Sequence, residues 1–359
     1  MVGALMRRAL RLAERGRGQT SPNPMVGAIV VLPDGTIVGD GYHEQAGTPH
    51  AEVHALNEAG GRARDARLIC TLEPCSHHGR TGPCVERIVA AGIKEVIAAV
   101  EDPNPRVAGG GFRYLESHGV SVTVGVEAGR ARQLNAPFFT AIQQGRPFVI
   151  AKAAVSVDGY VAAAPGQSTA ISSPASLRKV QQLRAEVDAI AVGVGTLLVD
   201  DPRLTVRDVY RPRPFVRAVF DRRLRTPPTA RVFRTLDSGP VHVFCDAAQA
   251  ETRAEQVSAL ERAGACIERT DGTLEAAFRR LAALGVLTVL LEGGPRIHQA
   301  AGEAGMIDEV RLFIAPTALG PGGVPMAEDA RLSIPSLQSV HLAMVGRDLQ
   351  VTGYVHRPH

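Results

Sequence analysis

The sequence predicts an α/β fold in two domains. Short apolar runs typical of buried strands alternate with segments whose apolar residues recur at helical spacing, and such alternation favours layered sheets covered by helices. The chain has 359 residues, which is more than one average domain holds. The pattern restarts after a short polar stretch at 142–146, so we expect one domain over 1–145 and a second over 146–359.

The first domain is expected to begin with a helix and a hairpin. Leu5, Ala9 and Leu12 lie at helical spacing and predict an amphipathic helix over 2–15. The loop TSPNPMVG follows, and its prolines exclude a helix there. Two strand-like runs joined by an Asp-Gly pair at 34–35 then predict a hairpin.

A helix, a strand and repeated β-α units complete the first domain. Pro49 suits the start of a helix over 51–59. The run RLICTLEP predicts a buried strand that ends at Cys75, and the residues from Cys84 to Ala91 predict the next helix. EVIAAV and VSVTVGV predict two more strands separated by a helix. The segment DPNPRVAGGGF follows the first of them, where α/β sheets tend to place ligands.

The second domain repeats the α/β pattern. Its expected strands are FVIAKAAVSV, AIAVGVG, PFVRAVF, VHVFCD, VLTVLLEG and EVRLFIAP, with a closing hairpin near LAMVGRDLQVTGYVH. Its expected helices are Pro174 to Ala185, Glu251 to Ala263 and Leu274 to Leu284. The closing hairpin predicts an antiparallel edge on the sheet.

The composition is that of a globular protein. Hydrophobic residues make up 45% and charged residues 21%, which excludes disorder as the general state. The net charge of +4 is small, aromatic residues make up 4% and tryptophan is absent, so a nucleic-acid-binding surface is disfavoured. Arginines interrupt the apolar residues at the N-terminus, and no run reaches membrane-spanning length. We expect a soluble cytoplasmic protein.

The five cysteines are odd in number and lack framework spacing, which fits a reducing compartment. Cys70, Cys245 and Cys266 are expected to be buried thiols, and no disulfide is required. The two remaining cysteines belong to a pattern with His50-Ala51-Glu52, Pro74-Cys75 and Cys84 in that order.

Two thiolates and an imidazole suit tetrahedral zinc and leave its fourth position for water, as in a catalytic site. Glu52, two residues from the histidine, is placed to carry a proton from that water to a leaving amine. The order matches the zinc deaminase signature H-x-E…P-C-x-x-C, except that eight residues, SHHGRTGP, separate the cysteines. The alternative, ordinary thiols with a surface histidine, is disfavoured because four residue types fall in the right order.

Two glycine turns in the second domain follow strands and precede helices. They are Gly195-Thr196 after AIAVGVG and Gly294-Pro295 after VLTVLLEGG. Glycine at such a point lets backbone amides approach a phosphate. Tight connections would also explain these glycines, and neither turn is a G-x-G-x-x-G.

Segments in both halves carry a resemblance to a known family. They are SPNPMVG, PHAE, LEPCSHHGRTGPC, DPNPRVAG, FVIAKAAVSVDG, LRAEVDAIAVGVGTLLVDDPRLTVR and LLEGGP. In these the chain resembles the bifunctional riboflavin-biosynthesis deaminase-reductases, whose cysteine spacing is also eight residues. The resemblance implies a cytidine-deaminase-like three-layer domain followed by a dihydrofolate-reductase-like domain.

The resemblance also implies two reactions. The first domain would use Zn²⁺ to deaminate 2,5-diamino-6-(5-phosphoribosylamino)pyrimidin-4-one. The second would use NADPH to reduce the ribosyl chain to ribityl, giving 5-amino-6-(5-phosphoribitylamino)uracil. A homo-oligomer, either a dimer or a tetramer, is expected.

Site residues are carried over from the resemblance motif by motif. The zinc ligands would be His50, Cys75 and Cys84, with Glu52 as proton shuttle. The deaminase pocket would contain Asn23, His43, Arg80, Asp102 and Asn104, with Arg80 facing phosphate. The reductase substrate would contact Lys152, Asp158, Ser168, Arg184, Leu204, Arg207 and Glu292, the arginines being suited to phosphate. The cofactor would lie along Ala154, Ala170, Thr196, Asp200, Arg222, Gly294, Pro295, Arg296, Ile297, His298, Gln299 and Ala300.

One departure bears on the cofactor. Ala170 stands where the family usually has tryptophan, which predicts weaker or shifted NADPH binding. For that reason a second domain that is only a non-catalytic dimerisation scaffold remains the main alternative. A nucleic-acid base deaminase with an RNA-binding second domain is disfavoured, because it would need a basic, aromatic-lined groove.

Overall fold

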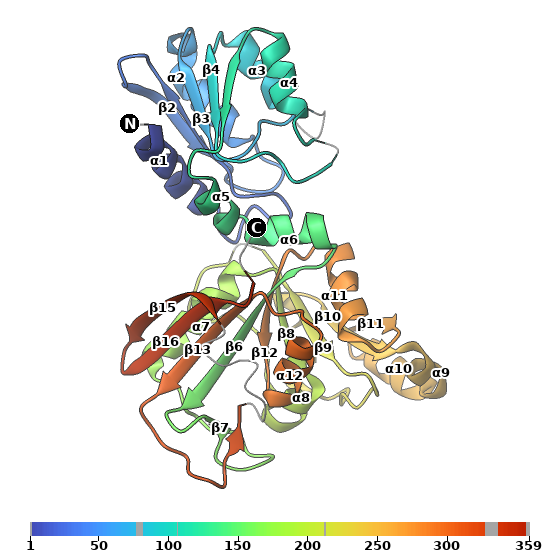
Figure 1. Ribbon diagram of the computed structural model, residues 1–359. Helices are drawn as coiled ribbons and strands as arrows, with labels where there is room; N and C mark the ends of the chain where they lie inside the picture. The colour runs from blue at the N-terminus through green and yellow to red at the C-terminus, as the bar shows by residue number, and fades with distance from the viewer. Residues whose placement is uncertain (1, 77–81, 106, 212, 327–336, 357–359) are drawn as a thin grey trace. The chain divides into compact units, whose positions relative to one another are not determined.

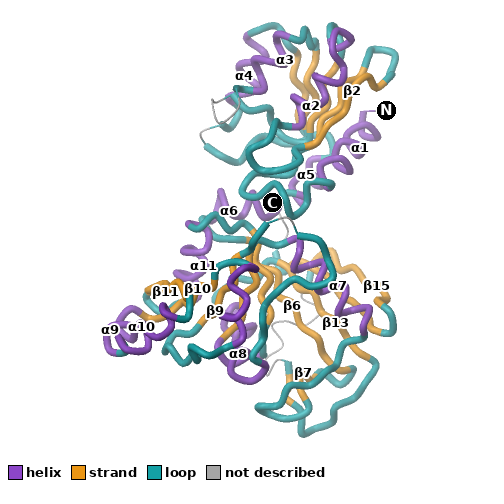
Figure 2. The backbone as a smooth tube through the Cα atoms, turned by 180° about the vertical axis from the view of Figure 1, so that it is seen from behind, coloured by secondary structure: helices purple, strands orange, loops and turns teal. Residues whose placement is uncertain are grey.

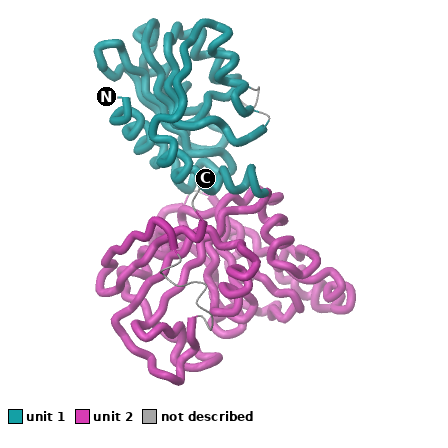
Figure 3. Tube along the Cα trace, viewed as in Figure 1, with its two compact units in different colours: residues 1–144, 358–359 teal, residues 145–357 magenta. Residues whose placement is uncertain are grey.

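The computed structural model describes residues 2–76, 82–105, 107–211, 213–326 and 337–356 (Figure 1, Figure 2). The chain divides into two compact units, one ending at Gln144 and the other beginning at Gly145 (Figure 3). Among the residues described, no helix has the length and apolarity that a membrane crossing requires.

The first unit is a three-layer α/β structure. Its helices are α1 (Val2–Glu14), α2 (Ala51–Ala59), α3 (Cys84–Ala90), α4 (Gly110–Ser117), α5 (Ala128–Leu134) and α6 (Ala136–Gln144), with a 3-10 turn η1 (Gly60–Ala63). Its strands are β1 (Gly27–Val31), β2 (Ile37–Tyr42), β3 (Arg67–Cys70), β4 (Glu95–Ala98) and β5 (Ser121–Val124). The sheet order is β2-β1-β3-β4-β5, antiparallel at β2-β1-β3 and parallel from β3 to β5.

Strand β1 shows why helices cover both faces of this sheet. All five of its residues are buried, and alternate side chains enter different cores. Ala28 and Val30 pack with α2, α3 and α4, whereas Ile29 and Val31 pack with α1 and α5. The predicted three-layer class is therefore confirmed.

Two glycines of β2 bring α2 unusually close to the sheet. A Cβ atom at Gly39 would lie 2.2 Å from the Ala55 carbonyl oxygen, and one at Gly41 would lie 2.8 Å from that of Ala51. Helix and strand therefore pack backbone to backbone. The N-terminus of α2 is thereby held against β2.

The second unit contains a nine-stranded mixed sheet. Its helices are α7 (Pro174–Glu186), α8 (Val194–Asp200), α9 (Ala247–Thr252), α10 (Ala254–Arg262), α11 (Leu274–Ala283) and α12 (Pro295–Glu303), with a 3-10 segment η2 (Arg231–Ser238). Its strands are β6 (Phe148–Ser156), β7 (Tyr160–Ala162), β8 (Ala189–Gly193), β9 (Val216–Phe220), β10 (Val241–Asp246), β11 (Ala265–Thr270), β12 (Thr288–Glu292), β13 (Glu309–Ala315), β14 (Val324–Pro325), β15 (Gln338–Val345) and β16 (Asp348–Tyr354).

The order of this sheet is β11-β10-β9-β8-β12-β6-β13-β16-β15. Strands from β11 to β13 run parallel, and β16 and β15 add the antiparallel edge that the sequence predicts. Strands β14 and β7 form a separate two-stranded sheet. The carboxyl ends of β8, β12 and β6 therefore lie next to one another.

Several expectations about elements are corrected. The strand predicted to run to Cys75 ends at Cys70, because the chain beyond Cys70 no longer pairs in register with β1 and β4. The helix predicted over 251–263 is two helices, α9 and α10, which meet at the non-helical Arg253. Strand β11 was not predicted. Cys266 is exposed rather than buried, because it lies on this edge strand with its side chain outward.

Candidate functional site

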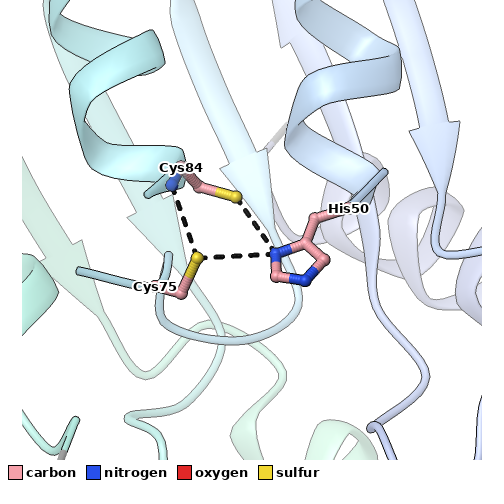
Figure 4. Close-up of side chains that lie close together, drawn as sticks. All are labelled: His50, Cys75 and Cys84. Carbon is pink, nitrogen blue, oxygen red and sulfur yellow. Dashed lines mark hydrogen bonds between the residues drawn. The ribbon is translucent and has the colours of Figure 1, made fainter. Parts of the chain in front are cut away.

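Three side chains from separate parts of the first unit converge on one point. His50 is the residue before α2, Cys84 is the first residue of α3, and Cys75 lies in the turn after β3 (Figure 4). The His50 Nδ1 atom lies 3.2 Å from the Cys84 sulfur and 3.4 Å from the Cys75 sulfur. All three donor atoms lie within 4.8 Å of one another.

This spacing fits a tetrahedral zinc ion. Zinc–nitrogen and zinc–sulfur bonds of ordinary length would place the imidazole nitrogen roughly 3.6 Å from each sulfur. The Cys84 backbone N–H also donates to the Cys75 sulfur at 3.4 Å. Hydrogen bonds from Cys84 and His50 outweigh burial and hold the pKa of Cys75 well below that of an ordinary thiol, which favours the thiolate that a metal ligand requires.

Glu52 lies in the first turn of α2 and is 3% exposed. Burial, with a smaller contribution from Cys75, raises its pKa to about 7. Its Oε2 atom is buried without a hydrogen-bond partner among the residues described. A buried polar atom without a partner is costly, so this oxygen indicates a group to be bound.

Asn23 and His43 lie beside His50, one of the predicted zinc ligands. The Asn23 amide nitrogen lies 3.1 Å from His43 Nε2, and His43 Nδ1 lies 3.2 Å from the Pro49 carbonyl oxygen. Because that carbonyl can only accept, Nδ1 carries the proton and Nε2 accepts from Asn23. The His43 ring packs edge-on against His50, with centroids 5.4 Å apart.

Of the remaining deaminase candidates, the structure describes Asp102 and Asn104 but not Arg80. The backbone N–H of Asn104 donates to the Asp102 carboxylate at 2.8 Å, so both lie in one turn after β4. The Asp102 N–H donates to Glu73 at 3.1 Å. Glu73 was not singled out from the sequence, where it reads only as part of a strand. Arg80 lies outside the described residues.

A cluster of charged side chains lies at the strand ends of the second unit. Glu292 at the end of β12 pairs in register with Lys152 of β6, with 4.0 Å between Oε2 and Nζ. Arg184 of α7 donates to both oxygens of Glu292, at 2.6 and 2.9 Å. Burial opposes ionisation of Glu292, but Arg184 and then Lys152 outweigh it and lower its pKa to about 2. The structure thus joins three predicted substrate residues.

An irregular segment over 201–207 is held beside this cluster. Arg184 also donates to the Thr205 carbonyl oxygen at 2.9 Å, and the Arg207 N–H donates to the Gln181 side chain at 2.9 Å. Leu204 is buried with a φ of 50°, a left-handed conformation rare for a branched side chain. The Arg207 side chain is exposed.

The two predicted glycine turns lie at the carboxyl ends of the neighbouring strands β8 and β12, but only one is a turn: Gly195 and Thr196 belong to the first turn of α8, whereas Gly294 immediately precedes α12. The Gly294 N–H donates to the Thr196 hydroxyl at 3.1 Å. A Cβ atom at Gly195 or Gly294 would meet nothing within 4 Å. The space above both backbones is open, which fits the close approach of a cofactor phosphate at the start of α12.

Within α12 the predicted cofactor residues face different ways. The Ile297 side chain covers Gly193 and Gly293, and a Cβ at Gly293 would lie 2.4 Å from it. His298 is fully buried, and its Nε2 atom lies 3.1 Å from the Leu291 carbonyl oxygen. Arg296, Gln299 and Ala300 are exposed, and Pro295 is the first helical residue.

Other predicted reductase residues have their own surroundings. Asp158 accepts from the backbone N–H groups of Leu319 and Gly320, at 3.1 and 2.8 Å, and so ties two loops together. The exposed Arg222 lies 3.6 Å from Asp246. Ala154 is half-buried on β6, while Ser168, Ala170 and Asp200 are exposed.

Comparisons with known proteins identify both units. Residues 2–100 match the cytidine and deoxycytidylate deaminase zinc-binding region, and residues 147–351 match the RibD C-terminal domain. The chain is 39% identical over 352 residues to the riboflavin biosynthesis protein RibD of Bacillus amyloliquefaciens, covering 97% of this chain and 94% of that protein. The chain belongs to the RibD family.

Other RibD proteins agree in sequence and fold. The RibD of Aquifex aeolicus is 42% identical over 318 residues, with 88% of this chain and 87% of that protein covered. The structure of Acinetobacter baumannii RibD superposes with a TM-score of 0.85 at 33% identity, covering 98% of both chains. A Thermotoga maritima structure described as a diaminohydroxyphosphoribosylaminopyrimidine deaminase/5-amino-6-(5-phosphoribosylamino)uracil reductase gives the same score, identity and coverage.

The family resemblance seen in the sequence is thus confirmed. As a RibD protein the chain is a bifunctional deaminase and reductase of riboflavin biosynthesis. Its cofactors are zinc in the deaminase domain and NADPH in the reductase domain. The scaffold alternative is not favoured, because the second unit matches the reductase domain of the family.

Proposed function

We propose that this RibD deaminates 2,5-diamino-6-(5-phosphoribosylamino)pyrimidin-4-one and then reduces its ribosyl chain to ribityl. The observation that carries the proposal is the convergence of His50, Cys75 and Cys84 beside the unpartnered carboxylate oxygen of Glu52. Zinc ligands together with a buried acid/base are what hydrolytic removal of an amino group requires.

In the deaminase, zinc when bound supplies Lewis-acid activation of water. Glu52 takes the proton from that water as the carbon–oxygen bond forms, and returns it to the amine as the carbon–nitrogen bond breaks. The pyrimidine is bound by Asn23, His43, Asp102 and Asn104. Arg80 binds the phosphate. Support comes from the contacts that place His43 against His50 and Asn23 against His43.

In the reductase, NADPH when bound supplies the hydride. Glu292 and Lys152 hold the ribosyl chain at the strand ends, and Arg184 holds Glu292 in place through two hydrogen bonds. Because Arg184 is engaged in this way, the exposed Arg207 is the better candidate for the substrate phosphate.

The remaining reductase residues divide between the two ligands. Asp158, Ser168 and Leu204 complete the proposed substrate pocket. The proposed cofactor contacts are Ala154, Ala170, Thr196, Asp200, Arg222 and the segment 294–300. The open glycine backbones and the hydrogen bond between Thr196 and Gly294 support a cofactor position there.

We further propose a homo-oligomer, a dimer or a tetramer, in the cytoplasm. The edge strand β15 presents Leu342 and Met344, 57% and 66% exposed, on one face, and such an apolar edge favours pairing with another copy. Sedimentation as a monomer would contradict this.

The cytoplasmic assignment rests on the two thiol ligands, which need a reducing compartment. Finding the active protein in an oxidising compartment would contradict it.

The test follows ammonia release and NADPH oxidation separately, in wild type and in Glu52→Gln. Glutamine cannot accept the proton, so ammonia release should fall by about 10²-fold or more. Zinc content, and NADPH oxidation with the deaminated intermediate supplied, should match wild type. A wild type that releases ammonia but oxidises no NADPH would contradict the reductase half; one that does neither would contradict both.

A further inference from the structure

A buried carboxyl group next to the zinc ligands has no part in the roles above. Glu73 lies two residues before Cys75 and is 4% exposed. Its two oxygens accept hydrogen bonds only from backbone N–H groups among the described residues. Oε2 accepts from Asp102 at 3.1 Å and Gly109 at 3.0 Å, and Oε1 accepts from Gly111 at 2.8 Å and Phe112 at 3.4 Å.

Three of these donors belong to the start of α4, whose first N–H groups have no partners within the helix. Gly109 immediately precedes α4, has a φ of 67° and offers no side-chain cap. Glu73 supplies the missing acceptor from a position distant in the chain. Residues 101–105, which include Asp102 and Asn104, and residues 107–112 are thus fastened to the turn that carries Cys75.

A second contact joins the same two segments. A Cβ atom at Gly111 would lie 2.1 Å from the Pro74 carbonyl oxygen, so α4 touches the backbone immediately before Cys75. From Glu73 the contacts continue through the Asp102 carboxylate to the Asn104 N–H at 2.8 Å. The metal-bearing turn and the proposed substrate-binding turn therefore form one connected structure.

We propose that Glu73 is a positioning residue for the deamination. It fixes where Asp102 and Asn104 stand relative to the zinc ligands, so that both residues are already in the arrangement that binds the pyrimidine. The proposal rests on the proposed function, in which these two residues contact the pyrimidine.

The test compares Glu73→Gln with Glu116→Gln in the full-length, zinc-loaded protein. Glutamine has one acceptor oxygen, and its NH₂ group would face N–H donors. Glu116 is an exposed glutamate on α4, the helix whose start contacts Glu73, and receives the same substitution as a control. For Glu73→Gln we expect the KM for the pyrimidine to rise about tenfold, with kcat within about threefold of wild type and zinc content unchanged.

Amide hydrogen exchange gives a readout that does not depend on activity. Exchange at Gly109, Gly111 and Phe112 should accelerate at least about tenfold in Glu73→Gln, while β3 and β4 keep wild-type rates. Glu116→Gln should change neither exchange nor KM.

Wild-type KM in Glu73→Gln would overturn the proposal, as would loss of zinc with a fall in kcat at constant KM. If Glu73→Gln does not fold, Glu73→Asp decides: its shorter carboxylate should still raise KM, and a wild-type KM would count against the positioning role. A wild-type protein that releases no ammonia would instead refute the proposed function, and hydrogen exchange would still decide whether Glu73 fastens the segment.

Discussion

Two buried ionisable side chains in the reductase unit make its stability depend on pH. Burial lowers the pKa of His298 to about 4 from an ordinary 6.5. The unfolded chain therefore binds a proton between these values while the folded chain does not, so stability falls as the pH drops from 6.5 towards 4. Glu292, with its pKa at about 2 against an ordinary 4.5, continues the loss below pH 4.5.

We expect His298→Gln to flatten the first of these slopes. Glutamine can still donate to the Leu291 carbonyl but does not titrate, whereas wild type should lose ~3 kcal/mol between pH 7 and pH 4 from this group. Urea unfolding of the full chain at several pH values measures this change in the free energy of unfolding. The transition of the reductase unit is recognised because added NADPH shifts it to higher urea concentration. His341→Gln, at an exposed histidine, should keep the wild-type slope, and equal slopes in all three proteins would refute the prediction.

Predictability from sequence differs sharply between residues. The grouping of His50, Cys75 and Cys84 was predictable, because a metal-ligand pattern is recognisable from residue types at short spacings. Glu73 was not, since its partners lie 29 to 39 residues further along and are backbone groups without a sequence signal. Leu204 is similar: its left-handed conformation depends on a segment anchored by Arg184 and Gln181.

Among the elements, α2 and β2 show how packing can set the geometry of a metal site. Gly39 and Gly41 admit the helix backbone, and His50 and Glu52 stand at that helix's first turn. Long periodic helices and apolar central strands were predictable from the sequence. Strand β11 was not, because an edge strand needs no continuous apolar run, and its sequence ACIERT is apolar only in its first half.

Gly41→Ala should therefore impair the deaminase selectively. The added Cβ would lie 2.5 Å from the His54 Cβ and 2.8 Å from the Ala51 carbonyl oxygen, forcing α2 outward. We expect a destabilisation of about 1–3 kcal/mol and weaker zinc binding, measured by competition with a chromogenic chelator. Gly61→Ala, where a Cβ meets nothing within 4 Å, is the matched control. Unchanged zinc affinity in Gly41→Ala would contradict this account.

For the whole molecule, each unit has its own sheet and its own buried core. The division near residue 145 was predictable because the α/β pattern restarts there. How β12 enters the middle of the second sheet was not, since strand order depends on contacts between distant segments.

Removing zinc should separate the two activities. A chelator should take the metal from the proposed site at His50, Cys75 and Cys84 and leave the second unit's core intact. Ammonia release should stop and return when zinc is added back, while NADPH oxidation with the deaminated intermediate should stay within about twofold of the untreated rate. Parallel loss of both activities would show that the reductase depends on the metal centre.

The central position of β12 also has a consequence for synthesis on the ribosome. The five strands of the first sheet are complete once residue 124 has emerged, and the last helix of that unit ends at Gln144, so the unit can fold early. In the second sheet, β6 and β8 emerge first, but they are not neighbours: β12, which ends at Glu292, lies between them. Until β12 has been synthesised, both edges of β6 lack their partner strands, β12 and β13. Chains released from the ribosome in this interval would expose apolar strands that can aggregate.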